Sequence, residues 1–166
     1  MAGIAKKAAS WTAAVVLSAA LVPPAAAGPP LKAPLASGEM VQPFDAEGLD
    51  GVMKHVDFPK GSATVVLFFL SGCPTCHKMI PEWNRAFERK PAKLNVVGVL
   101  MDREPPGFFE ATRIAFPVVR SPGRGFLEAW KVQRAPMTIR IGAWGKVEEA
   151  QIGIIDPIRL GEIFRP

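Results

Sequence analysis

Both cysteines of the chain lie in one short segment, where Cys73 and Cys76 flank a Pro-Thr pair and His77 follows directly. Two thiols at this spacing, placed in the first turn of a helix, can cycle between a dithiol and a disulfide. The same letters, read together with His77, also match the Cys-x-x-Cys-His pattern of covalent haem attachment. The motif alone therefore leaves two chemistries open, thiol–disulfide exchange and haem binding.

The order of the two thiols predicts a different role for each. The thiolate is the attacking species in thiol exchange, and the unpaired N–H groups at a helix N-terminus lower the pKa of a cysteine there. We expect Cys73 to be the nucleophile, Cys76 the resolving thiol, and a Cys73–Cys76 disulfide the oxidised form. Pro74, Thr75 and His77 would tune the thiol pKa values, because a cationic neighbour favours the thiolate and histidine changes charge near neutral pH.

The segments around the cysteines alternate between strand-like and helix-like patterns. Residues 63–70 form an unbroken β-branched and aromatic run, typical of a strand buried on both faces, and residues 74–90 predict an amphipathic helix. The stretch 44–58 is ambiguous between short strands and a helix. Further elements are expected at 93–101 (strand), 105–116 (helix), 117–119 (strand), 123–131 (helix), 137–141 (strand), 143–145 (turn), 146–153 (strand) and 157–164 (helix). This order predicts an α/β fold with a central mixed β-sheet flanked by helices.

Residues 1–27 have the layout of a cleaved secretory signal peptide: two lysines, the apolar run 8–22, and three alanines at 25–27. The apolar run is shorter than the ~20 residues of a membrane-spanning helix. We therefore expect cleavage and export to the periplasm, with a retained N-terminal membrane anchor as the alternative. Residues 28–43, rich in Pro, Ala and Gly, predict a flexible leader, and residues 44–166 a single domain.

Composition and charge narrow the classes of function. The formal charge of +5 falls by two without the signal lysines, and no cluster of Lys and Arg with interleaved aromatics indicates nucleic-acid binding. A disulfide between neighbouring cysteines closes too short a loop to stabilise the fold, so the pair in an exported protein points to chemistry. His55 is not spaced to join the cysteines in a metal site. Asp102 is expected to cap the following helix.

The chain resembles exported bacterial thioredoxin-like proteins, the TlpA/ResA type of thiol–disulfide oxidoreductase. The resemblance covers roughly residues 44–164 and is carried by three segments in the right order: 65–76 with Pro81 downstream, the strand 95–102, and 130–138 followed by two strands around Gly145. It implies a thioredoxin fold and an enzyme that exchanges two electrons with protein cysteines. The implied cofactor is none beyond the redox-active disulfide.

The resemblance also implies a substrate-binding element and partners. Pro136 would follow a cis peptide bond with Ala135, and this loop would face the cysteines and bind a substrate chain in extended form. Partners would be substrate protein thiols or disulfides, and an upstream electron donor or acceptor such as a membrane thiol oxidoreductase. Cytochrome c maturation is one task that the resemblance implies, and we expect a monomer.

Three positions depart from the family pattern. Gly72 stands where a tryptophan is usual, Leu67 where many thioredoxins carry a buried acid, and Met79 where many exported relatives carry a glutamate. The groups that usually relay a proton to or from the inner thiol are therefore absent.

Two other classes of protein stay open. One is a small c-type cytochrome with haem attached through Cys73 and Cys76 and ligated by His77. The α/β context argues against it, because attachment motifs in small cytochromes usually lie in helical chains. The other is a redox-inactive thioredoxin-fold binding module, against which the intact cysteine pair argues.

Overall fold

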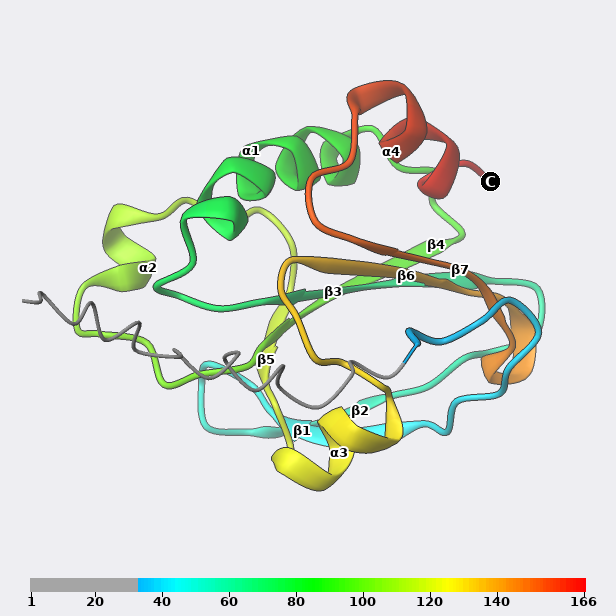
Figure 1. Cartoon of the computed structure of the whole chain (residues 1–166), viewed down its shortest axis with the longest axis horizontal. Helices are drawn as coiled ribbons and strands as arrows, with labels where there is room; N and C mark the ends of the chain where they lie inside the picture. Colours follow the sequence, from blue (N-terminus) through cyan, green and yellow to red (C-terminus); the bar gives the residue numbers. More distant parts are fainter. Residues whose placement is uncertain (1–32) are drawn as a thin grey trace, which may run out of the picture. The chain divides into compact units, whose positions relative to one another are not determined.

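A five-stranded mixed sheet organises the part of the chain that the computed structural model describes, residues 33–166 (Figure 1). The strand order is β5-β4-β3-β6-β7, with β3, β4 and β5 parallel and β6 and β7 antiparallel to their neighbours. The strands are β3 (Ala63–Phe69), β4 (Leu94–Leu100), β5 (Val118–Arg120), β6 (Met137–Ile141) and β7 (Val147–Ile152). The mixed α/β sheet predicted from the sequence is confirmed.

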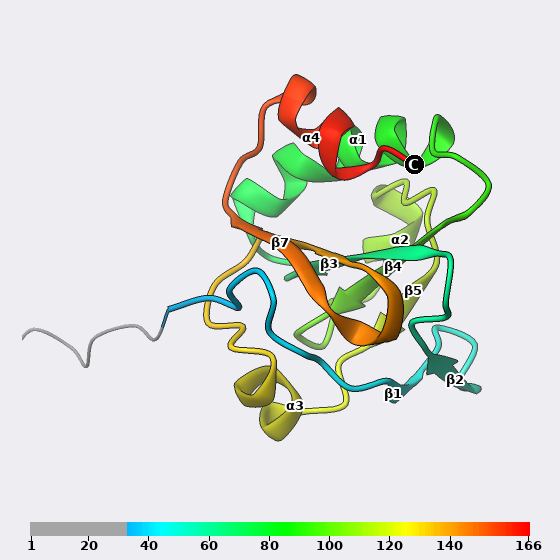
Figure 2. The ribbon, with the colours of Figure 1, turned by 90° about the vertical axis from the view of Figure 1, so that its right-hand side faces the viewer.

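Layers cover both faces of the sheet, which explains why the central strand β3 is apolar from Val65 to Phe69 (Figure 2). Val65, Leu67 and Phe69 pack in the core beneath α1 (Pro74–Glu88) and α4 (Pro157–Ile163). Val66 and Phe68 belong to the core on the opposite face. That face is covered by β1 (Phe44–Glu47), β2 (Met53–Val56) and α3 (Arg124–Ala129). Alternate side chains of one strand therefore build two separate cores.

The ambiguous stretch 44–58 forms an antiparallel hairpin, in which β1 pairs with β2. The chain before it is also packed. Leu35 and Val41 are buried, and the backbone N–H groups of Gly38 and Val41 donate to carbonyls of the β6–β7 turn region, each at 2.8 Å. Residues 35–43, expected to be part of a flexible leader, therefore belong to the packed unit. Local composition could not predict this packing, because their hydrogen-bond partners lie about a hundred residues away in the chain.

The helix expected over 105–116 is reduced to a single turn, α2 (Phe108–Ala111). Gly107 enters this turn with φ 81° and offers no side-chain cap, and the two prolines before it cannot donate backbone hydrogen bonds. Contrary to the expectation from the sequence, Asp102 does not cap this helix. Its carboxylate instead accepts hydrogen bonds from Ser71.

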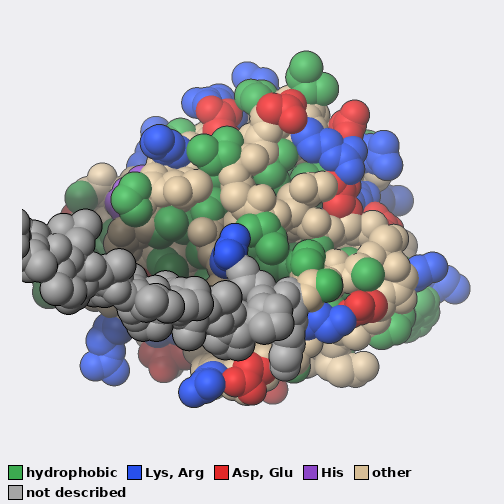
Figure 3. Space-filling view, in the orientation of Figure 1, with side chains coloured by type: hydrophobic (Ala, Val, Ile, Leu, Met, Phe, Trp, Pro, Cys, Tyr) green, Lys and Arg blue, Asp and Glu red, His purple; other side chains and the backbone are tan. Residues whose placement is uncertain are grey.

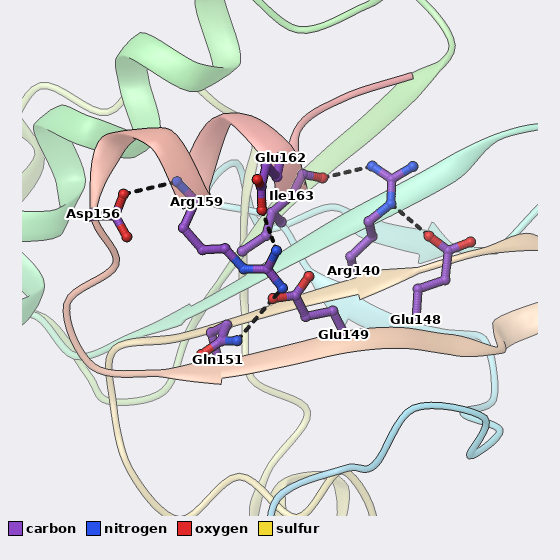
Figure 4. A network of polar contacts seen from close by, with 8 residues as sticks. All are labelled: Arg140, Glu148, Glu149, Gln151, Asp156, Arg159, Glu162 and Ile163. Carbon is purple, nitrogen blue, oxygen red and sulfur yellow. Dashed lines mark hydrogen bonds and ion pairs between the residues drawn. The ribbon is translucent and has the colours of Figure 1, made fainter.

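The C-terminal helix α4 is fastened to the sheet by a buried arginine (Figure 4). Arg140 of β6 is 8% exposed and donates from Nη1 to the carbonyl oxygens of Ile163 at 2.7 Å and Arg165 at 2.8 Å. Its Nε donates to Glu148 of β7 at 2.6 Å. Because unpaired carbonyls at a helix end require a donor, Arg140 provides the C-terminal cap of α4 from another element. Arg159 adds an ion pair to β7.

Charged side chains are mixed on the surface. On the face shown in Figure 3, Lys and Arg of the described residues are interspersed with Asp and Glu. Between residues 33 and 166 no helix is long and apolar enough to cross a membrane. The signal peptide expected at 1–27 and residues 28–32 of the leader lie outside the described residues.

Candidate active site

The two cysteines lie where β3 ends and α1 begins, and the structure has both as free thiols. Cys73 is the N-cap of α1, with extended backbone angles, and its Sγ accepts the backbone N–H of Cys76 at 3.3 Å. Pro74 occupies the first helical position, where its missing N–H leaves no bond unmade. A sulfur thus occupies the position that Ser, Thr or Asp usually fills at a helix start.

The two sulfurs have different surroundings. Cys73 is partly exposed, whereas Cys76 is fully buried in the core between α1 and the sheet. Partial burial opposes ionisation of Cys73, but hydrogen bonds from the Cys76 thiol, from backbone N–H groups and from Thr75 lower its pKa. The pKa of Cys76 is raised to about 12. Burial is the largest cause, followed by a hydrogen bond with the Cys73 sulfur and by the charges of Cys73 and Asp102. The exposed sulfur is therefore the one suited to attack.

A loop far along the chain approaches the exposed sulfur. The Ala135–Pro136 peptide bond is cis, and Sγ of Cys73 lies 3.8 Å from the Ala135 carbonyl oxygen, to which the thiol donates. β6 starts directly after this proline. Trp83 of α1 donates from Nε1 to Oγ1 of Thr138 at 3.2 Å, which ties the helix to the same strand. The loop that contains Pro136 therefore lies next to Cys73.

His77 turns away from the sulfurs. Its Nε2 lies 2.7 Å from the carbonyl oxygen of Ser71, so this nitrogen carries the proton and donates. The ring meets Phe108 edge to face at a centroid distance of 6.0 Å. The groups that lower the pKa of Cys73 are Cys76 and Thr75. Of the three residues expected to tune the thiols, Thr75 bonds Cys73, Pro74 shapes the turn, and His77 bonds the turn before the cysteines.

Sequence reasoning missed the role of Asp102. Ser71 lies two residues beyond the end of β3 and Asp102 two residues beyond the end of β4, and the strands pair in register with Phe69 opposite Leu100. The carboxyl ends of adjacent parallel strands lie at one edge of a sheet, which is where such sheets place their sites. The position of Asp102 just beyond the end of β4 could therefore have indicated a site residue, but prediction from local pattern did not use it.

His55 lies apart from the cysteines and bonds Asp45 at 2.7 Å on the exposed β1–β2 hairpin. Among residues 33–166, no group of three or more His, Cys, Asp or Glu side chains is arranged to hold a metal ion. The site thus consists of two unequal thiols, a nearby cis-proline loop and an anchored carboxylate. Such a site can exchange a dithiol for a disulfide.

Comparisons with known proteins identify similar sequences. The Redoxin family model matches residues 36–158. Sporulation thiol-disulfide oxidoreductase A of Bacillus subtilis is 24% identical over 110 residues, which cover 62% of this chain and 67% of that protein. Thiol-disulfide oxidoreductase ResA of Halalkalibacterium halodurans is 24% identical over 122 residues, covering 70% of this chain and 69% of that protein.

Solved structures show the same fold. StoA from Bacillus subtilis superposes with a TM-score of 0.63 at 20% identity, over 73% of this chain and 95% of that one. A putative thiol:disulfide interchange protein DsbE from Chlorobium tepidum gives a TM-score of 0.66 at 22% identity, over 78% and 93% of the two chains. The thioredoxin fold expected from the sequence is confirmed.

Proposed function

Because the chain belongs to the Redoxin family and has a thioredoxin fold, we propose that it is an exported thiol–disulfide oxidoreductase that acts through Cys73 and Cys76. Two similar proteins are also named thiol–disulfide oxidoreductases. The observation that carries the proposal is the inequality of the two sulfurs. One is partly exposed with a lowered pKa, and the other is buried with a raised pKa.

In the reductive direction, the Cys73 thiolate attacks one sulfur of a substrate disulfide. A Cys73–substrate disulfide forms, the substrate disulfide breaks, and the first substrate sulfur leaves as a thiolate. Cys76 then attacks Sγ of Cys73 and transfers its proton to solvent or to the second leaving sulfur. The protein ends with a Cys73–Cys76 disulfide and the substrate has gained two electrons, with one proton from Cys76, directly or through solvent, and a second taken up from solvent by the thiolate that left first. Oxidation of a substrate dithiol is the same sequence in reverse.

The Ala135–Pro136 loop is proposed to bind the substrate chain beside Cys73. The Ala135 carbonyl accepts from the nucleophilic sulfur at 3.8 Å, so a substrate segment bound at Cys73 would run alongside this backbone. Backbone groups suit a protein substrate of varied sequence, because they bind an extended chain whatever its side chains are.

A haem protein is less well supported by the same contacts. Haem attachment would require His77 as an axial ligand, whereas its Nε2 donates to the Ser71 carbonyl. It would also require a reachable Cys76, which is fully buried. Membership of the Redoxin family also favours thiol–disulfide exchange over haem binding.

Trapping tests the proposed roles. Cys76→Ser should accumulate a mixed disulfide with a disulfide-containing substrate, visible as a mass increase that dithiothreitol removes. Cys73→Ser should not, because its remaining thiol is buried. Wild type should reduce insulin disulfides, and the double variant should not. Trapping by Cys73→Ser alone would reverse the assignment, and equal activity of the double variant would refute the function.

Export, the electron partner and the substrate class are further parts of the proposal. We propose cleavage after residue 27, which intact-mass analysis of the exported protein tests: retention of Met1 would contradict it. We propose protein thiols as substrates, with apocytochrome cysteines as one class and a membrane thiol oxidoreductase as electron partner. A measured reduction potential tests the direction, since a strongly negative value favours a reductant and a high value an oxidant.

A further inference from the structure

A carboxylate holds the turn that precedes the nucleophile. Asp102 accepts the backbone N–H of Ser71 at 2.9 Å on Oδ1 and 3.1 Å on Oδ2, and the Ser71 hydroxyl at 2.9 Å on Oδ2. Ser71 is 5% exposed, so these bonds are largely removed from water. Bonds from a neutral donor to a charged acceptor are the stronger kind, and three of them converge on one side chain.

The same turn is held from the helix side. Ser71 receives the Nε2–H of His77 on its carbonyl oxygen, so its N–H, hydroxyl and carbonyl are all bonded. The next residue is Gly72, and a Cβ built there would meet no atom within 4 Å. No side chain therefore wedges the turn at position 72. Besides the backbone hydrogen bond from Cys73 N–H to the Leu70 carbonyl at 3.4 Å, the turn is held by the contacts that Ser71 makes with Asp102 and His77.

We propose, on the basis of the oxidoreductase function proposed above, that Asp102 is a positioning residue of the dithiol site. Its carboxylate fixes the turn that presents Cys73 and places a negative charge at that turn, between the end of β3 and the two thiols, so that the two thiols react in a set order. This role differs from that of a proton relay, because the carboxylate is already engaged by Ser71.

The charge acts on the second step of the reaction. Besides burial and contact with the Cys73 sulfur, the charges of Cys73 and Asp102 raise the pKa of Cys76. The other charged or titratable groups next to Cys76 in sequence, His77 and Lys78, lie on the exposed side of α1. The sheet residues that share a core with Cys76 are apolar: Val65, Leu67 and Phe69. A backbone hydrogen bond with Leu70 acts in the opposite direction and lowers the pKa of Cys76.

Cys76 therefore keeps its proton while Cys73 is a thiolate. When the mixed disulfide forms, the negative charge of Cys73 is lost, while burial and, to a smaller extent, the charge of Asp102 still oppose ionisation of Cys76. Cys76 then forms its bond to Sγ of Cys73 as its proton passes to the leaving substrate sulfur or to solvent. The electrons and the proton balance without any other reactant.

The test measures the pKa of Cys76 in a Cys73→Ser background, where one thiol titrates. Cys76 is followed by ¹³C NMR of labelled cysteine or by the pH dependence of alkylation. Asp102→Asn is expected to lower the pKa of Cys76 by at least about half a unit, a roughly threefold larger thiolate fraction. Glu104→Gln is the matched control, since Glu104 lines the same 490 Å³ cavity as Asp102 but pairs with Arg120. It should shift the pKa clearly less. Equal shifts, or none, would overturn the electrostatic role.

Ser71→Ala tests the positioning role and keeps the charge, so it also serves if Asp102→Asn does not fold. It should accelerate hydrogen exchange at the Gly72 and Cys73 amides and leave the pKa of Cys76 in place. Unchanged exchange would overturn the positioning role. Neither readout requires turnover. If wild type shows no disulfide exchange while the pKa shift appears, the proposed function fails and the electrostatic coupling stands.

Discussion

Alkylation of the reduced protein should modify Cys73 and spare Cys76 over the whole neutral pH range. A thiol with a pKa of about 12 is ionised at pH 7 only to about one part in 10⁵, whereas an ordinary thiol of pKa ~8.5 is ionised to a few per cent. Only the thiolate reacts, so ionisation alone should slow Cys76 by about three orders of magnitude. Its complete burial should slow it further. The lowered pKa of Cys73 acts in the opposite direction.

The assay is iodoacetamide labelling at several pH values followed by tryptic digestion and fragmentation of the peptide. Trypsin cuts after Lys60 and Lys78, so one peptide carries both cysteines, and fragment ions that break at Pro74 or Thr75 tell them apart. Labelling in urea is the control, because the two thiols should then react at similar rates. Similar rates in the folded protein, or faster labelling of Cys76, would refute the assigned environments of the sulfurs.

Three further predictions concern stability and pH. Gly98→Ala should destabilise by about 1–3 kcal/mol in urea melts, because its Cβ would lie 2.7 Å from a phenylalanine ring, whereas Gly125→Ala, in open space, should not. Arg140→Met should cost roughly 1.5–3 kcal/mol through the lost caps of α4, and the exposed Arg124→Met should cost less than about 1 kcal/mol. Burial raises the pKa of Cys76 above its unfolded value, so its contribution to stability is present below pH ~8.5 and lost as pH rises toward 12. Melts of the reduced protein at alkaline pH should therefore show a decline that is smaller in Cys76→Ser.

Elements with strong periodicity were predictable from local sequence. The apolar run 63–70 became β3 and the amphipathic stretch 74–90 became α1, because burial on two faces or on one face leaves a pattern that neighbouring residues reveal. The stretch 105–116 contains apolar residues but has no side chain that caps the N-terminus of a helix. Pro105 and Pro106 lack donors, and Gly107 has left-handed backbone angles and no cap, so one turn formed.

The prediction for Asp102 shows where local rules fail. An acid shortly before an apparent helix is ordinarily a cap, and that interpretation was wrong here. The carboxylate bonds Ser71, 31 residues earlier in the chain, because β3 and β4 pair in parallel register. The packed segment 35–43 is a similar case, since its partners lie in the β6–β7 turn region.

The sequence by itself indicated the candidate cysteine pair and the order of the elements. The spacing of Cys73 and Cys76, after a buried strand and at a helix start, is a property of nearest neighbours, and nearest neighbours fix local conformation and hydrophobic period. Only the tertiary structure decided what surrounds the sulfurs. The Ala135 carbonyl, 62 residues away, comes within 3.8 Å of Cys73, and Asp102 comes to bond Ser71 in the turn before the cysteines. Those neighbours depend on strand order and register, which arise from packing the whole chain around one sheet.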